Sequence, residues 1–210
     1  MTKSQPSFAK ATADTVETIR HSLSHIMAAV VKELYPGVKF GIGPAIENGF
    51  YYDFDFAYAN KDKDEFKNEF SRISPEDLPK IEEEMRELLK QDIKFIKKEI
   101  SQAEAEKLFA NQPYKLELIE ELSSPTNSSP SLTAVSEGEG KEGGGVSIYQ
   151  TNNFVDLCKG PHITSTKEIN AKAFKLTKTA GAYWRGDEKN EMLTRIYGLA
   201  FETEKELQDY

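Results

Sequence analysis

All three histidines and the only cysteine of this chain lie in two short motifs. The first is His21-Ser-Leu-Ser-His25, and the second is Cys158-Lys-Gly-Pro-His162. On a helix, His21 and His25 would lie about 40° apart on one face, and a Gly-Pro turn can bring Cys158 and His162 together. Three imidazoles and a thiolate could bind Zn²⁺ tetrahedrally or, without a metal, could perform acid–base hydrolysis. Alternatively, the histidines are surface or hydrogen-bonded groups and Cys158 is a small core residue.

Three further residues are candidates for the same chemistry. Asp156 lies two residues before Cys158 on a predicted strand, so both side chains would point to one face. Its carboxylate could orient a histidine or accept a proton, or it could form a salt bridge at the strand end. Lys115 and Tyr149 flank a segment rich in Ser and Gly, and by residue type alone they are solvated or packing residues.

A basic segment follows the second motif. Residues 159–195 carry eight basic and four acidic residues, a local charge of 8 − 4 = +4. The segment contains Tyr183, Trp184 and Arg185, and basic residues beside aromatic rings suit contact with a nucleic-acid backbone and stacking on its bases. The same aromatics could instead be core residues, with the lysines on an exposed edge strand.

The sequence pattern predicts a mixed fold of helices and strands. A helical periodicity starts at Asp14, an N-cap candidate with Glu17 three residues later, and ends at Pro36-Gly37. Its apolar stripe faces away from the histidines, whose small neighbours leave room for a ligand. Asn48-Gly49 between two strand-like runs predicts a hairpin. The remaining predicted elements are two helices within 61–92 divided by Pro75, strands at Ile93–Ile100, Tyr114–Ile119, Phe174–Leu176 and Met192–Phe201, and helices that begin at Ser101 and Thr203. Order is also expected over Ile148–Leu157, with a strand at Phe154–Leu157.

The composition excludes several classes of protein. The 210 residues include 27 basic and 35 acidic ones, a net charge of −8 that argues against a generic polyanion binder. No apolar run approaches the about 18 residues of a membrane span, and a single cysteine excludes a disulfide framework, so we expect a cytoplasmic protein without a membrane partner. The Ser, Pro and Gly content of residues 123–146 predicts a disordered low-complexity insertion. We therefore expect a flexible leader at 1–13 and ordered parts at 14–122 and 147–210.

Four stretches taken together resemble one family. RHSLSHIMAAVVKELYP, GIGPAIENGFYYDFDF, FVDLCKGPH and FKLTKTAGAYWRGDEKNEMLTRIYGLAF are similar to the editing region of bacterial threonyl-tRNA synthetases, over about residues 16–210. The editing domain of alanyl-tRNA synthetases, a more distant relative, shares the histidine pair and the Cys/His design. The resemblance implies an α+β (or α/β) fold in which a long histidine-bearing helix packs on a largely antiparallel sheet.

The resemblance also implies an activity, the hydrolysis of the ester that joins serine to the 3′ end of tRNA(Thr). His21 with Lys115 would orient and activate the water, and Asp156 would fix a partner. The pocket for the seryl group and the terminal adenosine would be shaped by His25, Cys158 and His162. Further substrate contacts are expected from Tyr149, Tyr183, Trp184 and Arg185.

The resemblance leaves the metal and the context of the chain open. Alanyl-type relatives resemble a zinc site at His21, His25, Cys158 and His162, whereas threonyl-type domains resemble sites that work without metal. We therefore expect a site that could bind Zn²⁺ but does not require it. Nothing in the sequence resembles the ATP-binding motifs of class II synthetases, so we expect no aminoacylation by this chain alone. It would be a free-standing editing protein, or part of a ligase with a separate catalytic chain as partner. The alternatives are a non-catalytic tRNA-binding or assembly module and a zinc-dependent esterase with another substrate.

Overall fold

The computed structural model describes residues 13–59, 73–123 and 145–210. The predicted leader except residue 13, the first of the two helices predicted within 61–92, and most of the predicted insertion at 123–146 lie outside the described residues. The helices are α1 (Ala13–Leu34), α2 (Leu78–Leu89), α3 (Gln102–Leu108), α4 (Pro113–Ser123) and α5 (Glu204–Asp209), with 3₁₀ turns at Pro75–Asp77, Thr166–Glu168 and Trp184–Gly186. The strands are β1 (Lys39–Phe40), β2 (Ala45–Ile46), β3 (Gly49–Asp55), β4 (Phe95–Ile100), β5 (Val146–Thr151), β6 (Phe154–Leu157), β7 (Phe174–Tyr183) and β8 (Met192–Ala200).

The larger sheet is five-stranded and antiparallel, in the order β1-β3-β8-β7 with β2 paired to β3. This confirms the predicted antiparallel sheet and the hairpin, whose turn is Glu47-Asn48, because Ile46 pairs with Gly49. The alternation along β3 places Phe50, Tyr52 and Phe54 in the core, where each is fully buried. Gly49 has no room for a side chain, since a Cβ there would lie 1.9 Å from the carbonyl oxygen of Gly198.

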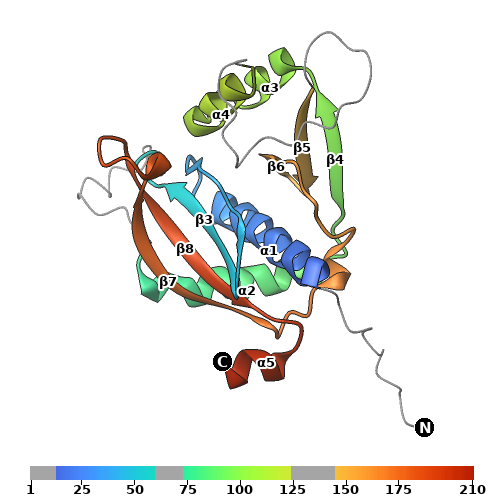
Figure 1. Ribbon diagram of the computed structural model, residues 1–210. Helices are drawn as coiled ribbons and strands as arrows, with labels where there is room; N and C mark the ends of the chain where they lie inside the picture. The colour runs from blue at the N-terminus through green and yellow to red at the C-terminus, as the bar shows by residue number, and fades with distance from the viewer. Residues whose placement is uncertain (1–12, 60–72, 124–144) are drawn as a thin grey trace.

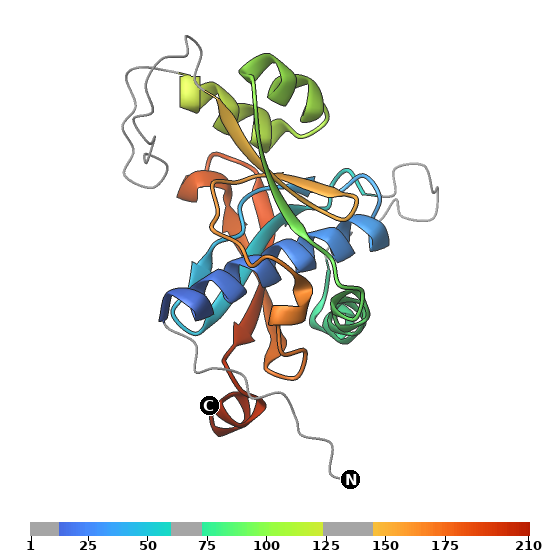
Figure 2. The ribbon, with the colours of Figure 1, turned by 90° about the vertical axis from the view of Figure 1, so that its right-hand side faces the viewer.

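Helix α1 runs between the two sheets, as Figures 1 and 2 show. Every residue from 22 to 31 is buried. The sequence predicted a helix with an apolar stripe on one side and room for a ligand on the other, but both sides are covered. The second sheet and the loop after β6 close over the histidine side. The helix already includes Asp14, so the predicted cap at that residue is wrong.

The second sheet has the order β4-β5-β6 and is antiparallel. One face contacts α1, and the other packs against α3 and α4 through a small apolar cluster of Ala105, Phe109, Ile119, Val146 and Ile148. The strand predicted at Tyr114–Ile119 is wrong, because this segment belongs to α4. Its buried pairs, 114–115 and 118–119, recur at the spacing of one helical turn, and Pro113 suits the first position of a helix. No described helix is both long and apolar enough to cross a membrane.

Candidate active site

The two sequence motifs converge on one point. His21 and His25 come from α1, Cys158 follows β6 directly, and His162 lies in the loop after it. One ligand atom from each of the four side chains lies within 4.8 Å of the other three. The Sγ atom of Cys158 is 3.4 Å from Nε2 of His21 and 3.2 Å from Nε2 of His162. The predicted gathering of these four residues is therefore present in the structure.

The hydrogen bonds around His21 determine which ring nitrogen carries its proton. Nδ1 of His21 is 3.2 Å from the carbonyl oxygen of Pro161, which can only accept. In the neutral ring, Nδ1 therefore donates, and Nε2 presents its lone pair toward Cys158.

Ser22 fixes the proton of His162 in the same way. The hydroxyl of Ser22 donates its one proton to the carbonyl oxygen of Thr18, 2.8 Å away. Its oxygen must then accept from Nδ1 of His162, at 3.0 Å, and from the backbone N–H of Ile163, at 3.1 Å. His162 thus also directs the lone pair of Nε2 at Cys158. Ser22 was not predicted as a site residue, although its place one residue after His21 could have indicated it.

Aromatic rings hold His162 in place. The ring of Phe95 stacks on it at 5.2 Å between centroids and 19° between planes, and the ring of Tyr149 meets it edge-on at 4.5 Å. Tyr149 also covers Gly160, where a Cβ would lie 2.4 Å from the tyrosine hydroxyl and where φ is +78°. Glycine is therefore required at this turn for two reasons, close approach and backbone conformation. The predicted site residue Tyr149 lies at the cluster, next to His162.

A buried polar network adjoins His25. Asp156 accepts a hydrogen bond from the hydroxyl of Tyr52 at 2.6 Å and forms an ion pair with Nζ of Lys115 at 2.5 Å. Its carboxylate also lies 3.5 Å from Nε2 of His25. The side chains of Lys115 and Asp156 are each only 3% exposed. Lys115 therefore lies on the Asp156 and His25 side of the cluster. The sequence analysis missed Tyr52, because strand alternation marked it as a core ring and gave no sign that its hydroxyl reaches Asp156.

Burial sets the protonation of the four clustered side chains. Removal from water lowers the pKa of His21, of His25 and of His162, because it disfavours the charged imidazolium. Burial raises the pKa of the Cys158 thiol to about 12, the charge of Asp156 adds to the rise, and the positive charges of Lys115 and Lys97 oppose it. Three neutral imidazoles and a neutral thiol therefore meet here.

The cluster could hold a metal ion such as zinc. Three imidazoles and a thiol match the ligands that Zn²⁺ prefers, and neighbouring ligand atoms around tetrahedral zinc lie about 3.3–3.6 Å apart. The two Cys158–histidine contacts, at 3.4 and 3.2 Å, are close to this spacing. In addition, Nδ1 of His25 is buried and has no hydrogen-bond partner in the described part of the chain. The donor set thus fits zinc.

The aromatic segment after β7 lies elsewhere. Trp184 is buried with Tyr114, Leu118 and Leu193 in an apolar cluster separate from the histidines, and its indole N–H donates to Glu117 at 2.8 Å. Arg185 forms ion pairs with Glu117 and Glu121 on α4. Tyr183 is 42% exposed. The structure therefore does not bring these three residues to the histidine and cysteine side chains.

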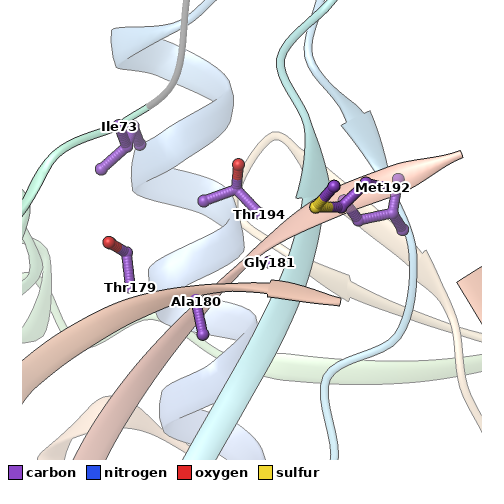
Figure 3. Close-up of a pocket in the computed structure, with 7 residues that line it drawn as sticks. Ile73, Thr179, Ala180, Gly181, Met192 and Thr194 are labelled. Atoms are coloured by element: carbon purple, nitrogen blue, oxygen red, sulfur yellow. The ribbon is translucent and has the colours of Figure 1, made fainter. Parts of the chain in front are cut away.

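Two hollows in the described part of the molecule differ in their relation to the site. The first, of about 220 Å³, lies at the end of the β7–β8 hairpin, and the seven residues that line it carry no titratable side chain (Figure 3). The second, of about 270 Å³, is bordered by Lys115, Asp156, Asn153, Gln112 and Lys32 among others. Only the second adjoins the polar network of the site.

Part of the chain that contains the site matches a known protein family. Residues 146–197 match the family described as the threonyl and alanyl tRNA synthetase second additional domain. This segment contains β5, β6, Cys158, His162 and most of the β7–β8 hairpin. It thus supplies one half of the cluster, and α1 supplies the other.

Similarity to threonine–tRNA ligases extends over nearly the whole chain. The chain is 48% identical over 196 residues to the enzyme of Thermotoga sp. (strain RQ2), covering 92% of this chain and 26% of that protein. It is 46% identical over 195 residues to the enzyme of Dehalococcoides mccartyi (strain CBDB1), covering 93% and 28%, and 45% identical over 202 residues to that of Rubrobacter xylanophilus, covering 95% and 26%. The chain spans about a quarter of the length of these relatives. Its sequence is therefore homologous to one part of the threonine–tRNA ligases, the part that contains the second additional domain.

Proposed function

We propose that the chain hydrolyses the ester that joins serine to tRNA(Thr) and so removes a wrongly attached amino acid. The observation that carries the proposal is the convergence of two imidazole lone pairs, of His21 and His162, on Cys158 beside the Lys115–Asp156 pair. Homology to threonine–tRNA ligases supports tRNA(Thr) as the nucleic-acid partner. Hydrolysis requires a group that accepts a proton from water, and these lone pairs provide it.

His21 is the general base in this mechanism. Its Nδ1–H is held by Pro161, so the ring can accept a proton only at Nε2. A water molecule attacks the ester carbonyl carbon and transfers one proton to that nitrogen. The bond from this carbon to the ribose oxygen then breaks, and the imidazolium returns the proton to the leaving oxygen. The products are free serine and a tRNA with a free terminal hydroxyl.

The remaining site residues position the reactants. His25, Cys158 and His162 would contact the seryl group and the terminal adenosine, and Asp156 fixes Lys115 and Tyr52 behind His25. Threonine differs from serine by one methyl group, so steric exclusion of that methyl would discriminate by about 10- to 200-fold.

Deacylation by the purified chain tests the proposal. We expect loss of serine from seryl-tRNA(Thr), with threonyl-tRNA(Thr) largely retained, and His21→Ala should lower kcat by about 10²- to 10⁴-fold. Lys98→Ala is the matched control, because the side chain of Lys98 is exposed and its Nζ bonds to Gln150. If His21→Ala deacylates as fast as the wild type, the assignment of the base is wrong. If the wild type binds tRNA without turnover, the chain is a binding or assembly module.

A zinc-dependent esterase is the second candidate, favoured by the unpartnered Nδ1 of His25 and the His₃Cys donor set. Bound zinc would supply Lewis-acid polarisation of the ester carbonyl, and His21, His25, Cys158 and His162 would hold it. Metal analysis of the purified protein separates the two candidates. If the protein contains less than about a tenth of an equivalent of zinc and its activity survives a chelator, the zinc-dependent esterase is ruled out.

A further inference from the structure

We propose that Lys97 binds the phosphate group that lies 5′ to the ester-bearing terminal nucleoside of the RNA substrate. This inference rests on the proposed function and adds a substrate-binding residue to it. In an RNA chain, the ribose that carries the aminoacyl ester is joined through its 5′ oxygen to a phosphate. A substrate whose ester lies at the histidine cluster therefore brings a negative charge to the rim of the site. A cation on this rim would bind that charge.

The strand register places Lys97 on this rim. Lys97 pairs directly with Tyr149 across β4 and β5, so the two side chains lie on the same face of the second sheet. Tyr149 contacts the ring of His162 and covers Gly160. Phe95, two residues before Lys97 and thus on the same face, stacks on His162 from the other strand. Lys97 therefore lies beside both rings that contact His162, opposite Tyr149 across the strands and two residues after Phe95 along β4.

Lys97 is free to bind a ligand. Its side chain is exposed, and it forms no ion pair or hydrogen bond within the described ranges of the chain. β4 lies at the edge of its sheet, and among the described residues only β5 pairs with it (Figure 1). Of the other lysines nearby, Lys94 and Lys167 both pair with Asp92 and Lys98 bonds to Gln150. The Nζ of Lys159, beside Cys158, has no hydrogen-bond partner among the described residues, but it is buried.

The other positive charges beside the cluster are less accessible than that of Lys97. Lys115 is buried and already paired with Asp156. Glu99 follows on the same face of β4 but forms no ion pair with Lys97 in the described structure. Lys97 is thus the exposed cation near the cluster that a phosphate can reach, whereas the unpartnered Nζ of Lys159 is buried.

Two small substrates that differ only in the phosphate test the inference. They are 3′-O-seryl-adenosine and the same ester carrying a 5′-phosphate. We expect the wild type to hydrolyse the phosphorylated ester with the higher kcat/KM, and Lys97→Ala to lower that value by about tenfold while leaving the unphosphorylated ester unchanged. Lys97→Arg should retain the preference, and the preference should weaken as salt rises.

Lys98→Ala is the matched control, because Lys98 is the neighbouring lysine on the opposite face of the same strand. An equal effect of Lys97→Ala on both esters, or an equal loss of the phosphate preference in Lys98→Ala, would overturn the inference. Failure of the wild type to hydrolyse either ester or seryl-tRNA would instead contradict the proposed function.

Discussion

Replacing Lys115 by methionine would leave the carboxylate of Asp156 buried without its cation. The two side chains are 3% exposed and their charged atoms lie 2.5 Å apart. Removing one partner of a buried ion pair costs about 3–5 kcal/mol, because the remaining charge stays in a medium of low polarity. Asp156→Asn leaves Lys115 unpaired in the same way, so we expect a similar loss. At about 2–4 °C per kcal/mol, each single variant should melt roughly 6–20 °C below the wild type.

The double variant, Lys115→Met with Asp156→Asn, decides whether this reasoning holds. It buries no unpaired charge, and the amide oxygen introduced at position 156 could still accept the hydrogen bond that Tyr52 donates to Asp156 at 2.6 Å. We therefore expect the double variant to be more stable than either single variant, with a coupling of at least about 2 kcal/mol. Urea unfolding followed by circular dichroism gives all four free energies of unfolding. Single variants within about 1 kcal/mol of the wild type, or strictly additive losses, would refute the buried-pair argument.

Three further predictions concern other parts of the molecule. Gly49→Ala should cost about 1–3 kcal/mol or more in urea unfolding, because its Cβ would meet the Gly198 carbonyl at 1.9 Å, whereas Gly145→Ala, with no neighbour closer than 4.0 Å, should cost little. In metal-free protein at pH 8, iodoacetamide should alkylate Cys158 at least about tenfold more slowly than in urea, since burial raises its pKa to about 12; equal rates would contradict this. Hydrogen bonds from Lys167, Ser165 and Lys94 lower the pKa of Asp92, so its contribution to stability is present above its unfolded pKa of about 3.9 and lost as pH falls through its lower folded value. The free energy of unfolding of Asp92→Asn should therefore fall less than that of the wild type between about pH 4 and pH 2. If the two proteins lose stability in parallel over this range, Asp92 does not contribute in this way.

The sequence was sufficient to predict that the histidines and the cysteine gather, but not that Tyr52 joins Asp156 and Lys115 behind them. His21 and His25 at a four-residue spacing, and Cys158 and His162 around a Gly-Pro turn, could be related because the chain has no other histidine or cysteine. Tyr52 could not be related to the site in this way, since the alternation along its strand indicates only that the ring is buried. Its hydroxyl reaches Asp156 from another sheet, a relation that depends on tertiary packing.

The secondary structure shows the same limit. The alternation around Phe50 predicted β3 correctly, because one face of that strand meets a continuous core. The short apolar run at Tyr114–Ile119 fits a strand and a buried helix equally well, and it forms α4. Likewise, periodicity does not distinguish a helix such as α1, whose two sides meet different sheets, from a helix with one side in solvent. The sequence analysis therefore predicted open space beside His21 and His25, where the structure has the second sheet and its loop.

The position of α1 between the two sheets also bears on how the protein folds. Cys158 and His21 are 137 residues apart in the chain, and Ser22 and His162 are 140 apart. Contacts of such long range require the chain to close a large loop before they contribute any stability, and they tend to form late in folding. During synthesis, α1 leaves the ribosome well before β5 and β6, so its histidine face stays uncovered until those strands have been made. The cluster then assembles only once both halves of the core are present, and a catalytically competent site would report that the whole domain has folded.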